Sequence, residues 1–497
     1  MCIGQGMILL DNTIVNVALP AIQRGLRVTP GALEWTINAY VLALASLIVL
    51  GGTLGDRYGR KRLFLVGLAL FTVFSAACGF ARSDAALIVS RGLQGVGAAI
   101  MAPLTLSILV DAYPPEGRPT AIGIWASVAG LGFGAGPIIG GALIGIAGWP
   151  AIFWVNVPIG IAGFALTCLA VRESRDPGAR SLDPIGTALV SAGLSVLTFA
   201  LIETNVHPWL SSYTLGLGAI AAAALVAFVA WEARVAHPMV PLGLFRNPVW
   251  SAANAIYALV YVSLAAMFFF VTLYFQNVKG WSAVHTGLSW IPLNVPFLAV
   301  SPFAGRLVKR FGGGWITGGG ALIGAAGMLA LSRLTADSTF AAACPGYLLI
   351  GLGYGMLVPA VSAAAMAAVG AEHSGVGSGI LNSSRQVGAA VGLAVLGSIS
   401  VAAVSNAWLA SPGALPETAR AKAAALLQQV AGAEADAVAA ILGPEARLAA
   451  IDAFLSGYRA AMMIAGVLLV VAAVIAFAGL RAGTPAPKPD RVPAKTQ

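Results

Sequence analysis

Residues 51–62 read GGTLGDRYGRKR, and this short segment lies between two long apolar runs. Gly52 and Gly59 allow a tight turn and close contact between helices. Four basic residues surround one acid, Asp56. A plain loop that anchors the chain to one side of a membrane would explain the bases but not the acid or the glycine spacing. We therefore interpret the segment as a gate, in which Asp56 pairs with a nearby base or caps a neighbouring helix.

The predicted gate cluster contains the conspicuous residues of this segment and one partner for Arg60 at the end of the fourth apolar run. Its members are Gly52, Asp56, Arg57, Gly59, Arg60, Lys61 and Asp111.

The spacing of the segment recurs in the second half of the chain. Four of its positions return 253 residues later as Gly305, Lys309, Arg310 and Gly312. A second set returns 256 residues later, with Gly95, Gly97 and Pro103 repeated as Gly351, Gly353 and Pro359. Such internal repeats are typical of transporters built from related bundles. They predict two six-helix bundles with two inserted helices between them.

The composition is that of an integral membrane protein, because 59% of the 497 residues are hydrophobic and only 9% are charged. Soluble domains carry roughly a quarter charged residues. A net charge of +9 could suggest nucleic acid, but the bases lie in short loops between apolar runs, so no nucleic-acid partner is expected. Cysteines and histidines show no metal-ligand spacing. We see no catalytic constellation or phosphate-binding loop and expect neither an enzyme nor an ATP-driven pump.

Fourteen apolar runs approach the roughly 20 residues that span a membrane. They cover approximately 2–23, 33–54, 63–81, 85–110, 119–145, 150–171, 185–204, 212–232, 249–275, 284–304, 315–334, 341–366, 377–404 and 458–481. Lys and Arg are more frequent in the loops that follow even-numbered runs, which places both termini in the cytoplasm.

These runs predict an all-α integral membrane protein with four parts. They are an N-terminal bundle (1–171), the inserted helices with their linkers (172–248), a C-terminal bundle (249–481) and a disordered cytoplasmic tail (482–497). The alanine-rich outer loop at 405–457 is predicted to form short surface helices.

Three charged residues in the first four runs are candidates for a membrane function. Asp11 lies about mid-way through the first run, where carboxylates are costly and usually functional; hydrogen bonding by a protonated Asp11 is the alternative. Arg91 needs a partner or water, or else snorkels to the outer headgroups. Glu34 lies at the outer start of the second run and could instead be interfacial.

The fifth run carries small residues at helical spacing. Gly132, Gly136 and Gly140 lie four residues apart and share one face, which allows close packing. Pro137 interrupts the backbone hydrogen bonding and predicts a kink, and Gly141 follows it. We predict a hinge at these five residues, with packing alone as the alternative.

A substrate cavity is expected to be lined by aromatic and amide side chains, although a lipid-facing position is an equal alternative for each. The candidates are Asn12, Asn16, Trp35, Asn38, Tyr40, Gln94, Met101, Asn156, Asn254, Tyr257, Phe269 and Gln276.

At these motifs the chain resembles the major facilitator superfamily, and more narrowly its fourteen-spanner drug:proton antiporters of the EmrB/QacA subfamily. The pattern G-x8-G-x3-G-P-x2-G-G from Gly123 to Gly141 is characteristic of antiporters. The resemblance implies that Asp56 and Arg60 close the inner gate, that Gly136 and Pro137 form the antiporter hinge, and that Asp11 and Arg91 serve proton coupling.

We also expect a multi-pass protein of the inner or plasma membrane that acts as a monomer. It would export small amphiphilic molecules by alternating access, driven by protons without a cofactor or metal. A dedicated exporter of one natural product, a nutrient symporter and a non-transporting receptor remain alternatives.

Overall fold

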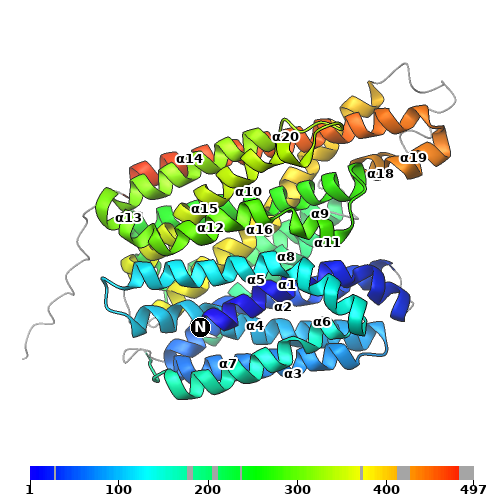
Figure 1. Ribbon diagram of the computed structural model, residues 1–497. Helices are drawn as coiled ribbons and strands as arrows, with labels where there is room; N and C mark the ends of the chain where they lie inside the picture. The colour runs from blue at the N-terminus through cyan, green and yellow to red at the C-terminus, as the bar shows by residue number, and fades with distance from the viewer. Residues whose placement is uncertain are drawn as a thin grey trace, which may run out of the picture.

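The computed structural model describes residues 1–26, 30–175, 183–203, 211–235, 238–369, 373–410 and 426–480. Fourteen helical segments in this part are long and apolar enough to cross a membrane. The predicted number of crossings and the all-helical fold are therefore confirmed for the described residues. The helices run roughly alongside one another in two groups (Figure 1).

Six crossings form the N-terminal group, drawn in blue and cyan in Figure 1. The first five are α1 (Cys2–Leu26), α2 (Pro30–Tyr58), α3 (Arg60–Phe80), α4 (Asp84–Ala112) and α5 (Arg118–Ala147). The sixth is divided into α6 (Ala151–Trp154) and α7 (Asn156–Ala170). The closest packing within this group is between α2 and α4, α3 and α4, and α1 and α5.

The next two crossings are α8 (Pro184–Glu203) and α9 (Ser212–Glu232), which pack against each other. Helix α8 also contacts α2 and α16 (Ser374–Leu409), which belong to different groups. The inserted pair therefore lies against the place where α2 and α16 meet.

The remaining elements form the C-terminal group. They are η1 (Leu242–Arg246), α10 (Pro248–Leu273), η2 (Tyr274–Val278), α11 (Ala283–Leu288), α12 (Ile291–Val300), η3 (Ser301–Phe303), α13 (Ala304–Phe311), α14 (Gly313–Leu331), α15 (Phe340–Val369), α16, α18 (Leu427–Ala431), α19 (Ala435–Leu442) and α20 (Glu445–Gly479).

The last helix begins earlier than predicted, at Glu445 rather than at residue 458. Its first turns contain Glu445, Arg447 and Asp452, so a hydropathy criterion excludes a stretch whose backbone is nevertheless helical. The outer loop is correspondingly shorter. Two short helices, α18 and α19, do occur in its described part, as expected.

The sequence repeat is also a structural repeat. Gly59 separates α2 from α3 with a φ of 109°, and its counterpart Gly312 separates α13 from α14 with a φ of 90°. Residues with a side chain rarely adopt this backbone conformation, which explains why glycine stands at both turns. In the fourth crossing, Gly95 lies against the carbonyl of Tyr40, and its counterpart Gly351 lies against the carbonyl of Leu293.

The same repeat brings the two groups together at one end of the molecule. A Cβ atom at Gly52 would clash with the carbonyl oxygen of Gly375 in α16. A Cβ atom at the equivalent Gly305 would clash with Pro119 at the start of α5. Each group therefore uses a glycine of one helix to approach the first turn of a helix in the other.

Candidate functional site

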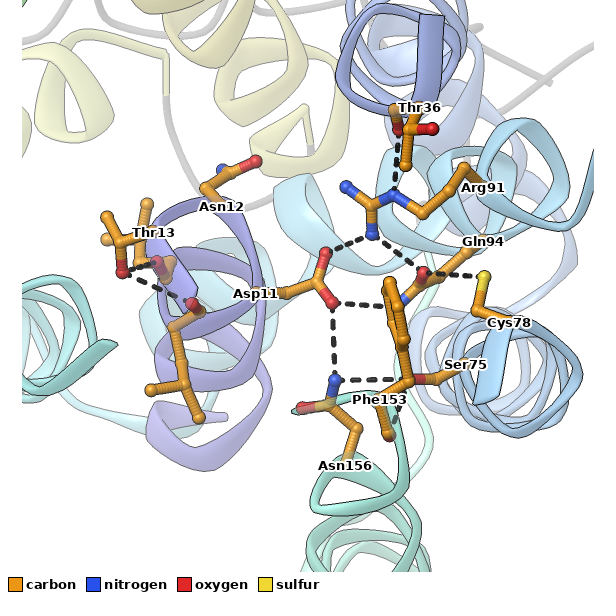
Figure 2. Close-up of polar contacts among 12 residues, drawn as sticks. Asp11, Asn12, Thr13, Thr36, Ser75, Cys78, Arg91, Gln94, Phe153 and Asn156 are labelled. Carbon is orange, nitrogen blue, oxygen red and sulfur yellow. Dashed lines mark hydrogen bonds and ion pairs between the residues drawn. The ribbon is translucent and has the colours of Figure 1, made fainter. Parts of the chain in front are cut away.

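A buried ion pair joins α1 and α4 inside the N-terminal group (Figure 2). Asp11 Oδ2 lies 2.6 Å from Nη1 of Arg91, and the two side chains are 0% and 1% exposed. Leaving one member of such a pair unpaired in a low-dielectric interior costs several kcal/mol. Arg91 is therefore held by a partner, and the snorkelling alternative does not apply to it.

The pair belongs to a larger polar network of buried hydrogen bonds. Gln94 Nε2 donates to Asp11 Oδ1 at 2.9 Å, and Asn156 Nδ2 donates to the same oxygen at 3.2 Å. Arg91 Nε donates to the carbonyl of Thr36 at 3.1 Å, and Nη1 donates to Gln94 Oε1 at 2.8 Å. Three residues, Thr36, Gln94 and Asn156, thus make four hydrogen bonds to the ion pair.

Aromatic and hydroxyl groups complete the network. The Arg91 guanidinium lies 4.2 Å from the ring centre of Tyr40, close enough for a cation–π contact. Ser75 accepts a bond from Asn156 at 3.1 Å and donates to the carbonyl of Phe153 at 2.8 Å. Cys78 Sγ lies 3.7 Å from Gln94 Oε1. Together with Asp11 of α1, the network thus draws on residues of α2, α3, α4, α6 and α7 (Figure 2).

A central cavity of about 250 Å³ lies between the two groups of helices. Gln5, Leu9 and Asn12 line it from α1; they are four and three residues apart and share one helical face. In Figure 2, Asn12 leaves α1 in a different direction from Asp11. Helix α1 therefore presents one face to the cavity and another to the polar network.

The rest of the lining contains six aromatic side chains, two amides and one base. They include Trp125, Tyr257, Tyr261, Phe268, Asn294, Phe297, Tyr354, Arg385 and Gln386. Of the twelve predicted cavity residues, Asn12 and Tyr257 belong to this lining. Arg385 and Gln386 of α16 belong to it as well.

The other ten predicted cavity residues do not line this cavity. Tyr40, Gln94 and Asn156 are part of the polar network. Met101 is completely buried in the core of the N-terminal group. Buried polar side chains need hydrogen-bond partners, and a buried ion pair provides them. The hydroxyl and amide groups therefore face the ion pair instead of the cavity.

The remaining six predicted cavity residues lie at contacts between helices or on the surface. Asn254 donates to the carbonyl of Trp250 and accepts from Ser384. The ring centres of Trp35 and Phe199 of α8 are 6.0 Å apart. Asn16 and Phe269 are exposed, and Asn38 and Gln276 are half-buried outside the lining.

The gate cluster connects the two groups through Asp56. Its Oδ1 accepts a hydrogen bond from the backbone N–H of Gly375 at 3.0 Å, and its Oδ2 accepts one from Val376 at 2.8 Å. These are amides of the first turn of α16, where the helix dipole favours an anion. Asp56 also lies 2.7 Å from Arg60, so it both pairs with a base and caps a helix.

The charged gate residues other than Asp56 make their contacts within the N-terminal group, whereas Gly52 lies against Gly375 of α16. Arg60 lies 3.5 Å from Asp111, its predicted partner. Lys61 Nζ donates to the carbonyl of Cys168 at 2.8 Å, and the ring centre of Tyr58 lies 5.2 Å from the Arg57 guanidinium. Glu173, which was not predicted, accepts bonds from the backbone N–H groups of Lys61 and Arg62. The sequence feature that could have indicated this role is the position of Glu173 just after the sixth crossing.

The glycines of α5 face two different neighbours. Gly132, Gly136 and Gly140 face α1, where added Cβ atoms would meet Gly6, Thr13 and Ile14. Gly141 faces Val284 of α11, and Pro137 packs against Gly287 of the same helix. Helix α5 is therefore held closely between α1 of its own group and α11 of the other.

Glu34 lies in α2, but its side chain is outside the described part of the structure. Among the described residues, no group of three or more His, Cys, Asp or Glu side chains is placed to hold a metal ion.

Comparison with known proteins places these features in a family. The model of the Major Facilitator Superfamily matches residues 1–393. The Tetracenomycin C resistance and export protein of Streptomyces glaucescens is 35% identical over 100% of this chain and 94% of its own length. Multidrug resistance protein Stp of Mycobacterium tuberculosis (strain ATCC 25618 / H37Rv) is 37% identical over 81% of this chain and 75% of its own.

A solved structure shows the same fold at low identity. The proton:xylose symporter XylE aligns with a TM-score of 0.61 and 12% identity, over 95% of this chain and 93% of that one.

Proposed function

This chain belongs to the major facilitator superfamily, and from that premise we propose that it exports drug-like amphiphilic molecules in exchange for protons. Members of the family are transporters rather than enzymes, so a small-molecule substrate and a multi-pass position in the bilayer follow directly. The direction of transport and the energy source are the parts that we propose.

Export of drug-like molecules is supported by the relatives. The Streptomyces relative is a tetracenomycin C resistance and export protein, and the Mycobacterium relative is a multidrug resistance protein. The central cavity supports the same substrate class, because aromatic side chains with a few amides suit planar amphiphiles. We place the protein in the plasma membrane with both termini in the cytoplasm, because Lys and Arg are more frequent in the loops that follow even-numbered crossings.

Proton coupling is the role that we assign to the Asp11–Arg91 pair, and this pair is the single observation that carries the proposal. A proton on Asp11 would cancel the ion pair, while Arg91 would keep Thr36, Gln94 and Tyr40 as partners. One proton that moves down a potential of 100 mV releases about 2.3 kcal/mol. Asn12 lies next to Asp11 and lines the cavity, so α1 could transmit a change at the carboxylate to the substrate.

Alternating access is supported by the contacts of the gate cluster. The two bonds from Asp56 to the first turn of α16 hold one end of the molecule closed. Opening that end requires them to break, whereas the Asp56–Arg60 pair can persist because both residues belong to one bundle. The gate is thus a switchable contact between bundles, and α5 is the element about which we propose that they rock.

The proposal is tested by expression in a drug-sensitive host and a growth panel of toxic amphiphiles, with and without an uncoupler. We expect protection that disappears with the uncoupler and with Asp11→Asn, at equal membrane abundance of the protein. Protection that survives both treatments would contradict proton coupling. An absence of protection against every compound, with abundant protein, would contradict broad export.

A dedicated exporter of one natural product is a second candidate, favoured by the alignment of the whole chain with the tetracenomycin C exporter. Protection against a single chemical scaffold in the same panel would favour it.

A further inference from the structure

Arg385 is a buried base in the central cavity. It lies in α16, its residue is 4% exposed, and it belongs to the cavity lining. Its Nε atom is buried without a hydrogen-bond partner, and no ion pair of Arg385 is present among the described residues. The ring centre of Tyr261 lies 5.7 Å from its guanidinium. A cation–π contact of this kind offsets only part of the cost of burying a guanidinium.

The lining offers no acid to neutralise this charge. Among the described lining residues there is no aspartate or glutamate, and Arg385 is the one charged side chain. Asp11 does not belong to the lining and is already paired with Arg91. The cavity therefore has a positive charge that its own walls do not balance.

A second donor in the lining also lacks a partner. Gln5 is completely buried, and its Oε1 accepts a bond from Thr105 at 3.3 Å, whereas its Nε2 has no partner among the described residues. Gln5 comes from α1 and Arg385 from α16, so the unpaired donors lie on both bundles. Unpaired buried donors are rare and point to a missing acceptor.

We propose that this cavity selects aromatic substrates that carry a negative charge, and that Arg385 is their counter-ion. The inference rests on the proposed transport function and narrows its substrate class. A planar carboxylate or sulfonate would accept from the guanidinium fork of Arg385. The aromatic part of the molecule would pack among Trp125, Phe268 and Phe297. A cationic amphiphile would find repulsion there and no acid to pair with.

Three naphthalene probes that differ only in permanent charge test this inference. They are 2-naphthalenesulfonate, 2-naphthalenesulfonamide and 2-naphthyltrimethylammonium. Binding is measured by equilibrium dialysis with the purified full chain in nanodiscs of zwitterionic lipid. We expect the sulfonate to bind at least about tenfold more tightly than the neutral sulfonamide, the effect of one charge-assisted hydrogen bond. Equal affinities, or a preference for the ammonium, would overturn the proposal.

Variants then assign the preference to one residue. Arg385→Gln should remove the advantage of the sulfonate and leave the sulfonamide unchanged, and Arg385→Lys should keep part of it. Arg333→Gln removes an exposed base outside the lining and is the matched control. Sulfonate selectivity that persists in Arg385→Gln would overturn the assignment. If Arg385→Gln does not fold, the comparison of the three probes on the natural chain still decides.

Binding separates this inference from the proposed function. Sulfonate selectivity without uncoupler-sensitive export would refute the proposed function alone. Uncoupler-sensitive protection against neutral and cationic compounds, with no binding preference for the sulfonate, would refute the inference alone. Decanesulfonate, a non-aromatic anion, tests whether the aromatic ring contributes to binding. Binding as tight as that of 2-naphthalenesulfonate would overturn the proposed preference for aromatic anions.

Discussion

Replacement of Asp56 by asparagine should open the gate end of the molecule. Among the described contacts of Asp56, the two hydrogen bonds that it accepts from Gly375 and Val376 cross between the bundles, and asparagine loses the charge and one of the two acceptors. A hydrogen bond to a charged group contributes about 1.5–3 kcal/mol. Loss of one such bond corresponds to a shift of about ten- to 150-fold toward the open state. The Arg60 pair is common to both states and does not enter this difference.

Double electron–electron resonance measures the shift directly. Nitroxides on Arg62→Cys and Trp315→Cys, in a background without the four native cysteines, report the separation of the two bundles. The two positions are 253 residues apart, which is the offset of the repeat, and both are exposed. We expect Asp56→Asn to add a population at longer distance.

The matched control for this experiment is Asp111→Asn. It removes another carboxylate from Arg60, but Asp111 lies in α4 of the same bundle as Arg60. The distance distribution of Asp111→Asn should equal that of the natural chain. An unchanged distribution in Asp56→Asn, or an equal change in both variants, would refute the gate interpretation.

Two further predictions concern the packing and the ion pair. Gly136→Ala forces a Cβ atom against Thr13 and should destabilise the protein by about 1–3 kcal/mol and reduce transport, whereas Gly145→Ala meets no atom within 4 Å and should be tolerated; unfolding in SDS measures both. Arg91→Gln leaves the Asp11 charge buried and should cost about 3–5 kcal/mol by the same measurement, and adding Asp11→Asn should restore most of it. Additive losses in the double variant would contradict the pairing.

Helix number and the repeat could be predicted from the sequence because they depend on local properties. A span is recognised by its length and hydropathy, and Gly59 and Gly312 mark turns whose backbone conformation only glycine adopts easily. The start of the last helix at Glu445 could not be found in this way, since a helix that extends beyond the apolar run carries no hydropathy signal.

The partners within the site depend on contacts that one sequence does not contain. Asp11 and Arg91 each stood out as costly in a membrane, yet their pairing spans 80 residues and depends on how α1 packs beside α4. Which face of each helix meets the cavity is likewise set by packing. Gln94 was therefore predicted for the cavity and lies in the network, whereas Gln5 was overlooked and lines the cavity.

Exchange in proteoliposomes tests the central claim, that Asp11 couples protons to transport. A transported aromatic amphiphile is followed in two modes, accumulation driven by a pH gradient and exchange of labelled for unlabelled substrate without a gradient. Asp11→Asn should abolish the driven accumulation and retain the exchange, because the variant keeps the cavity and loses the site that takes the proton. Driven accumulation at the level of the natural chain, or loss of both modes in a folded protein, would contradict the account.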